Sequence, residues 1–135
     1  MRSEPEIVTA LAARAGMLHF FVEVEGTDYP PMPYLLFSDP LSSPRELDPD
    51  LQHTESDETL LYVTVVDSTA GNVHSTRTLV REMLTPGGYS VNEAGYRVKR
   101  IPGEFIGIQV DAETPRDAYG RRPYFAVDVY RLVKE

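Results

Sequence analysis

The stretch from Tyr62 to Val80, "YVTVVDSTAGNVHSTRTLV", passes from an apolar run into a helical pattern, and so joins the two kinds of element on which the fold depends. Residues 59–66 carry apolar side chains on both faces, as the central strand of a sheet does. After the junction, one helical stripe is formed by Val73, Thr76, Leu79, Val80, Met83 and Leu84. The stretch therefore predicts a buried strand followed directly by a helix that packs on the sheet.

The junction itself, "DSTAGN" at residues 67–72, is of the kind where phosphate sites are built. A Walker loop needs two glycines at fixed spacing and a lysine, and a dinucleotide fingerprint needs G-x-G-x-x-G. This junction has a single glycine, Gly71, and no lysine, and Asp67 would repel an anion bound at the start of the helix. We expect Gly71 to let the chain turn and Ser68 or Asn72 to cap the helix, without a nucleotide.

The rest of the pattern predicts an α+β fold. Ser3 and Glu6 form a capping box for a first helix over residues 4–15. Further strands are predicted over residues 18–24, 34–37, 96–101, 104–110 and 124–133. This order indicates a largely antiparallel or mixed β-sheet with two α-helices packed on one face. The chain of 135 residues is predicted to form a single domain, 1–135.

Residues 38–58, "SDPLSSPRELDPDLQHTESDE", stand apart as a long polar loop with three prolines, seven acids and one arginine. Compact domains rarely keep such a length without a use for it, so we expect a flexible acidic loop or an arm that orders on a partner. The segment matches a calcium loop only at Asp48 and Asp50. His53 stands in place of the required glycine and Thr59 in place of the bidentate glutamate, so no metal site is predicted.

Composition disfavours several other classes of protein. Acidic residues outnumber basic ones by 21 to 13, and the formal net charge of -8 repels nucleic-acid phosphates and anionic lipid. There is no cysteine, so neither disulfides nor thiolates contribute. No apolar run approaches the roughly 20 residues that span a membrane, and the acidic start "MRSEPE" lacks the basic region of a signal peptide. The sequence predicts a cytoplasmic product.

No catalytic arrangement is evident either. His19, His53 and His74 lack the spacing that places two metal ligands on one face of a helix. No serine lies in a G-x-S-x-G motif, and carboxylate pairs such as Asp111 with Glu113 arise by chance in a chain with 21 acids. We expect no enzyme activity and no cofactor. A small adaptor or ligand-binding protein is an alternative, which would need a pocket with convergent polar groups.

The charged residues form two unlike groups that suit contacts between copies. The acidic candidates are Asp48, Asp50, Asp57 and Glu58, and the basic candidates are Arg97, Lys99, Arg100, Arg116, Arg121 and Arg122. Rings are built from heterologous contacts, in which one patch meets a different patch on the next copy. Opposite charges favour such pairing, so we predict that these residues form an interface. The alternative for each of them is a solvated surface position.

A series of motifs, in order, covers nearly the whole chain: "PYLLF", a polar loop, "LLYVTVVDSTAGNVHSTRTLVREML", "GYRV" and a closing "AYGRRPYFAVDVYRLV". In this order and spacing the chain resembles the tail terminator proteins of long-tailed phages (siphoviruses), also called minor tail or tail-completion proteins, especially those of phages of actinobacteria. The family's strand and its arginine-bearing helix are matched by Tyr62, Val63 and Val65 and by Arg77 and Arg81. Its acidic stretch, tyrosine, arginines and terminal strand are matched by Asp111, Glu113, Asp117, Tyr119, Arg121, Arg122 and residues 124–133.

The resemblance implies a structural virion protein of the tail or neck, assembled in the host cytoplasm. It implies a homo-hexameric ring that sits on the end of the tail tube, terminates its polymerisation and provides the surface for head-tail joining. The implied partners are further copies, the tail tube protein and the head-tail connector or stopper, with no direct sequence-specific nucleic-acid binding and no membrane. The alternation in "LHFFVEV" and the lack of tryptophan depart from the family pattern. A connector or stopper role in the neck is therefore the alternative.

Overall fold

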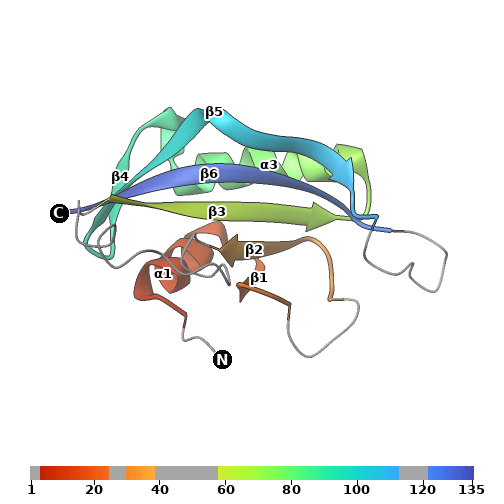
Figure 1. Ribbon diagram of the computed structural model, residues 1–135, viewed down its shortest axis with the longest axis horizontal. Helices are drawn as coiled ribbons and strands as arrows, with labels where there is room; N and C mark the ends of the chain where they lie inside the picture. Colours follow the sequence, from red (N-terminus) through yellow and green to blue (C-terminus); the bar gives the residue numbers. More distant parts are fainter. Residues whose placement is uncertain (1–3, 25–29, 39–57, 113–121) are drawn as a thin grey trace, which may run out of the picture.

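Two helices and six strands make up the computed structural model (Figure 1), which describes residues 4–24, 30–38, 58–112 and 122–135. The helices are α1 (Glu6–Ala15) and α3 (Ala70–Leu84), with a short 3₁₀ turn, η2 (Pro86–Gly88), after the second. The strands are β1 (Leu18–Phe21), β2 (Tyr34–Ser38), β3 (Glu58–Asp67), β4 (Val91–Glu93), β5 (Tyr96–Val110) and β6 (Tyr124–Lys134).

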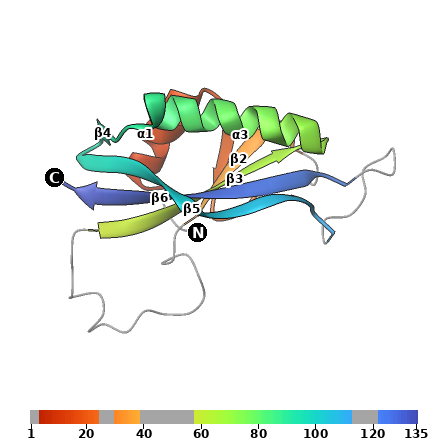
Figure 2. The same cartoon turned by 90° about the horizontal axis from the view of Figure 1, so that it is seen from above.

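The strands form one mixed sheet in the order β1-β2-β3-β6-β5-β4. Only β1 and β2 pair in parallel, and every other neighbouring pair is antiparallel. Both helices lie on the same face of this sheet (Figure 2), α1 over the β1–β3 side and α3 over β6 and β5. The prediction of a largely antiparallel sheet with two helices on one face is confirmed. Of the predicted acidic loop, residues 39–57 lie outside the described residues.

The hydrophobic core lies between the sheet and the helices. In β3, alternate residues Leu61, Val63 and Val65 point to the helices and are at most 2% exposed. Their partners in β6 and the residues of both helices complete the core, which includes Ile7, Val8, Leu11, Val73, Val80, Leu84, Ala126, Tyr130 and Leu132. Since successive side chains of a strand point to opposite faces, every second residue of these strands lies on the far side of the sheet.

The start of α3 differs in detail from the prediction. Thr69 is the N-cap, because its hydroxyl oxygen accepts a hydrogen bond from the Asn72 backbone N–H at 3.1 Å, and neither Ser68 nor Asn72 has this role. Gly71 lies inside the first turn of the helix and does not have a positive φ. The chain therefore turns before Gly71, and any small residue with moderate helix propensity would serve there.

The buried stripe of α3 is narrower than predicted. Val73, Val80 and Leu84 are buried, whereas Leu79 and Met83 are 45% and 40% exposed. Leu79 and Met83 lie one turn apart on the flank of the helix, too far round it to reach the sheet. These two residues were wrongly assigned to the core.

Other helix and strand boundaries differ from the predicted ones for local reasons. Pro5, not a serine, precedes α1, and it makes no side-chain cap. The first strand ends at Phe21 because Val22 has a φ of 75°, so the alternation up to residue 24 overstated its length. The strands predicted over 96–101 and 104–110 are one continuous β5, with shifts of register between Arg100 and Phe105 and between Ile106 and Gln109. The three residues of β4 are too few to show a period.

The adjacent residues Val80 and Leu79 provide a matched test of the helix assignment. Val80 is 1% exposed and Leu79 is 45% exposed on the same helix. We expect Val80→Asp to prevent folding, because burying an unpaired carboxylate costs several kcal/mol against a total stability of roughly 5 to 15 kcal/mol. Leu79→Asp should melt close to the wild type in circular dichroism. Equal, cooperative melting of both variants would contradict the assignment.

Candidate functional site

The face of the sheet that points away from the helices (Figure 2) carries mostly apolar residues, as the strand register shows. An antiparallel sheet with one solvated face normally carries polar residues there. We define the open face, from the strand register, as Leu18, Phe20, Tyr34, Leu36, Leu60, Tyr62, Thr64, Val66, Ile106, Phe125, Val127, Val129 and Val133. Neither helix contributes to its burial, so among the described elements this face has no covering layer.

The open face is large enough for a stable protein contact. Strands lie about 4.8 Å apart and rise about 3.3 Å per residue, so a sheet of this width and a strand of β3's length give an area on the order of 700 Å². A standard interface takes roughly 800 Å² from each partner. On this face Leu18 and Ile106 are 43% and 45% exposed, whereas Val66 and Val129 are 6% and 8% exposed. An apolar surface of this size marks an interaction site more often than a solvated surface.

Aromatic side chains order the edge of the open face formed by β1 and β2. The rings of Phe20 and Tyr34 meet edge to face, with centroids 5.5 Å apart. Burial, and after it the charge of Asp111, raises the pKa of the Tyr34 phenol above its ordinary value. Tyr34 therefore stays neutral over the physiological range and contributes to the apolar character of this face.

One end of the open face is basic. Lys99 in β5 and Arg131 in β6 are directly paired across the two strands, and Arg97 is paired with Val133 one step along. We call Arg97, Lys99 and Arg131 the basic end. Like charges directly opposite each other in an antiparallel pair are destabilising. The arrangement therefore favours the binding of additional negative charge.

The negative charges found at the basic end neutralise it only weakly. Arg131 lies 3.6 Å from Glu58, and Arg97 lies 3.7 Å from Glu135, with all four side chains more than 40% exposed. Exposed pairs at such distances contribute little to stability and exchange partners readily. Within the described parts of the chain, Lys99 makes no ion pair.

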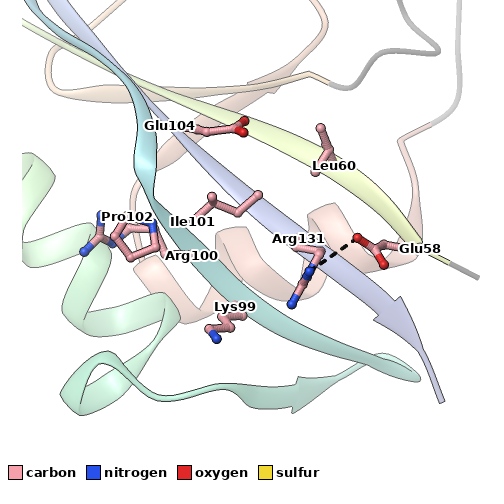
Figure 3. A pocket seen from close by; sticks show the side chains of 8 residues that line it. All are labelled: Glu58, Leu60, Lys99, Arg100, Ile101, Pro102, Glu104 and Arg131. Carbon is pink, nitrogen blue, oxygen red and sulfur yellow. Dashed lines mark ion pairs between the residues drawn. The ribbon is translucent and has the colours of Figure 1, made fainter.

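A hollow of about 380 Å³ lies at this end of the sheet (Figure 3). Its lining residues are Glu58, Leu60, Lys99, Arg100, Ile101, Pro102, Glu104 and Arg131. In Figure 3, Arg131 points toward Glu58, and the side chains of Lys99 and Arg100 extend from β5. The hollow thus combines cationic groups with the apolar side chains of Leu60 and Ile101, a combination that suits a peptide with acidic and apolar residues.

The structure separates the basic residues that the sequence grouped together. Arg97 and Lys99 lie on the open face, whereas Arg100 is paired with Tyr130 on the helix side. Arg122 precedes the opposite end of β6, a strand of 11 residues, and so lies about 35 Å from the basic end. The predicted interface residues outside the described part are Asp48, Asp50, Asp57, Arg116 and Arg121.

Sequence reasoning missed Arg131, which the structure places beside Lys99. Arg131 is isolated within the apolar run of the last strand, and its neighbours become known only once β5 and β6 are paired in register. Glu58, by contrast, was a predicted interface residue and does line the hollow. The period of two in β5 is the signal that the sequence contains, because it places Lys99 on the same face as Arg97 and Arg100 on the other face.

On the helix side, a partly buried ion pair joins α3 to β6. Arg81 donates from Nε to Asp128 Oδ2 at 2.7 Å and from Nη2 to Asp128 Oδ1 at 2.6 Å, and Asp128 is 3% exposed. These hydrogen bonds raise the pKa of the Arg81 guanidinium above its ordinary value. A bidentate geometry fixes the rotation of the helix as well as its distance from the sheet.

The Asp67 side chain lies at the junction before α3, where an anion would bind. Its Oδ1 accepts a hydrogen bond from the Ser68 backbone N–H at 2.7 Å, and its Oδ2 accepts one from the Thr76 hydroxyl at 3.4 Å. The Asp67 carboxylate is 7% exposed. A buried negative charge therefore occupies the start of the helix, and this arrangement opposes phosphate binding there.

The helix layer also contains buried donors without partners among the described residues. They are Nε and Nη1 of Arg77 and the hydroxyl of Tyr130. Burial, with the charge of Asp128, raises the pKa of the Tyr130 phenol far above its ordinary value, although Arg100 and Arg81 oppose this shift. These groups lie under α3, away from the open face, and they leave the helix layer slightly less stable than full pairing would.

Comparisons with protein-family models, with curated proteins and with solved structures find no match. In the described ranges, no group of three or more His, Cys, Asp or Glu residues is placed to hold a metal ion. No helix in these ranges is long and apolar enough to cross a bilayer.

The Arg81–Asp128 pair has a measurable effect on stability. Arg81→Met leaves Asp128 buried without a partner, and we expect a loss of about 3 kcal/mol in the free energy of unfolding. The double variant Arg81→Met/Asp128→Leu should recover most of this loss, because no unpaired charge is left. Denaturant titration of both variants measures the difference. A double variant as unstable as the single one would contradict this account of the pair.

Proposed function

We propose that this chain is the subunit of a phage tail terminator, a hexameric ring that binds the end of the tail tube and stops its growth. The open face is the observation that carries the proposal. A folded chain with a complete core beneath its helices leaves a second apolar surface of interface size on the far side of its sheet. The choice of assembly, a hexameric ring on the tail tube, is based on the resemblance of the motif order to the terminator family.

The two sides of the molecule suit ring formation. One side is the apolar open face with its basic end, and the chain as a whole carries a formal charge of -8, so the remaining surface is more acidic than this side. Unlike surfaces meet in heterologous contacts, and such contacts close into rings when the rotation between copies allows it. Termination of a tube needs only a surface that occupies the growing end, and no chemical step.

Deletion of the gene tests the role in the phage. We expect tails of uncontrolled length that fail to join heads, because the tube end would keep a free site for the next subunit. Electron microscopy of the lysate measures tail length directly. Tails of normal length with empty or unstable heads would instead assign the protein to the connector or stopper position.

In vitro, purified protein added to polymerising tail tubes should arrest their growth. Thr64→Lys places a charge at the centre of the open face, since Thr64 lies between Leu36 and Val127 in register, and we expect it to abolish the arrest. Ser75→Lys, at an exposed position on α3, is the matched control and should act as the wild type does. Full activity of Thr64→Lys would exclude the open face from the mechanism.

A further inference from the structure

We propose that the basic end of one copy binds the acidic segment 39–57 of the next copy. This inference rests on the proposed ring, and it names the charged part of the contact between neighbouring subunits. The observations that carry it are the pairing of Lys99 with Arg131, which the exposed Glu58 neutralises only in part, the hollow beside them, and the length and charge of the segment.

The basic end has unused capacity for carboxylates. Lys99 faces Arg131 across the strands, which costs free energy unless anions lie between them. Glu58 at 3.6 Å from Arg131 is the nearest described counter-charge, and its side chain is 47% exposed. Carboxylates from another chain can therefore add at Lys99 and compete for Arg131 without breaking a buried interaction.

The segment has the composition that this surface would recognise. Its 19 residues, 39–57, include six acids and one arginine. In "RELDPDLQ", at residues 45–52, leucines alternate with acids around a proline. An extended peptide of this kind can direct acids to Lys99 and Arg131 and leucines to the apolar wall of Leu60 and Ile101.

The attachment points allow the segment to reach another copy. It leaves the sheet after Ser38, which is paired with Tyr62, and returns at Glu58, only four residues away along β3. Spanning that distance of about 13 Å needs few residues, so the length of a 19-residue segment sets an upper limit of roughly 30 Å on its reach beyond the sheet.

Net charge favours the neighbouring copy as the partner. Each chain carries a formal charge of -8, so copies repel one another unless the contact itself pairs opposite charges. Binding of the acidic segment at the basic end supplies this pairing once per contact. The contact is also heterologous, as a ring requires, because the segment and the basic end are different surfaces.

Charge reversal on each side, measured by sedimentation over a range of concentrations, tests the proposal. We expect Arg97→Glu/Lys99→Glu and, separately, Asp48→Lys/Asp50→Lys to raise the concentration of half-assembly about tenfold or more. Both positions in β5 are exposed, so the fold should be retained, and thermal melting checks this. Arg122→Glu is the control, because it changes the charge at one site by the same amount but lies about 35 Å from the basic end. This variant should assemble as the wild type does.

Mixing distinguishes a contact between copies from binding within one chain. An equimolar mixture of the two reversed variants should regain assembly, since each contact then joins either two native or two reversed surfaces. If the segment binds its own sheet, mixing restores nothing and the proposal is overturned. Assembly of either reversed variant at wild-type concentrations also overturns it.

Tube arrest separates this inference from the proposed function. If the wild type forms rings that arrest tubes and the reversed variants do the same, the contact is wrong and the terminator role stands. If the wild type stays monomeric at every concentration and has no effect on tubes, the terminator role and the contact fail together. Loss of both assembly and arrest in the reversed variants, with recovery of both on mixing, is the expected result.

Discussion

The antiparallel pairing of β3 with β6 determines the rest of the structure. Ten residue pairs, from Glu58 with Val133 to Asp67 with Tyr124, align the two longest apolar runs at the centre of the sheet. This register decides which side chains lie under the helices and which lie on the open face, because a shift by one residue would exchange the two sets. It also places Asp128 beneath α3 and Arg131 on the opposite face.

The two faces that result are not equivalent. The helix side is complete by itself, with an apolar core and the Arg81–Asp128 pair that holds α3 over β6. The open face is also largely apolar, although among the described elements only strand neighbours shield it, and its charges gather at one end. We infer that selection for a contact, and not for the stability of the isolated chain, accounts for this second apolar surface. A subunit of the proposed ring needs such a surface.

The sequence predicted the architecture better than the surfaces. Residues 34–37, 59–66 and 124–133 are strands in the structure, as their apolar runs indicated, and the helix after the junction is present. The end of β1 was wrong because the alternation continues past Val22, where the backbone turns. Leu79 and Met83 were misplaced since helical spacing alone does not show how wide a stripe the sheet can cover. Arg81 and Asp128 are 47 positions apart, and only the tertiary structure joins them.

The interface prediction was limited for the same reason. Clusters of charge in the sequence became separate groups once strand direction was known, with Lys99 on one face, Arg100 on the other and Arg122 at the far end of the sheet. The grouping that matters, Lys99 with Arg131, depends on register between two strands. A single sequence contains the period of each strand but not the pairing between them.

The most direct test of the account is the accessibility of the open face in the assembly. The chain has no cysteine, so Thr64→Cys introduces a unique thiol at the centre of that face. Its rate of reaction with a maleimide should fall by about an order of magnitude when the protein passes from dilute subunits to rings, because a docked partner excludes the reagent. Ser75→Cys on α3 should react at one rate throughout. Equal rates for Thr64→Cys in dilute subunits and in rings would contradict the claim that the open face is the assembly surface.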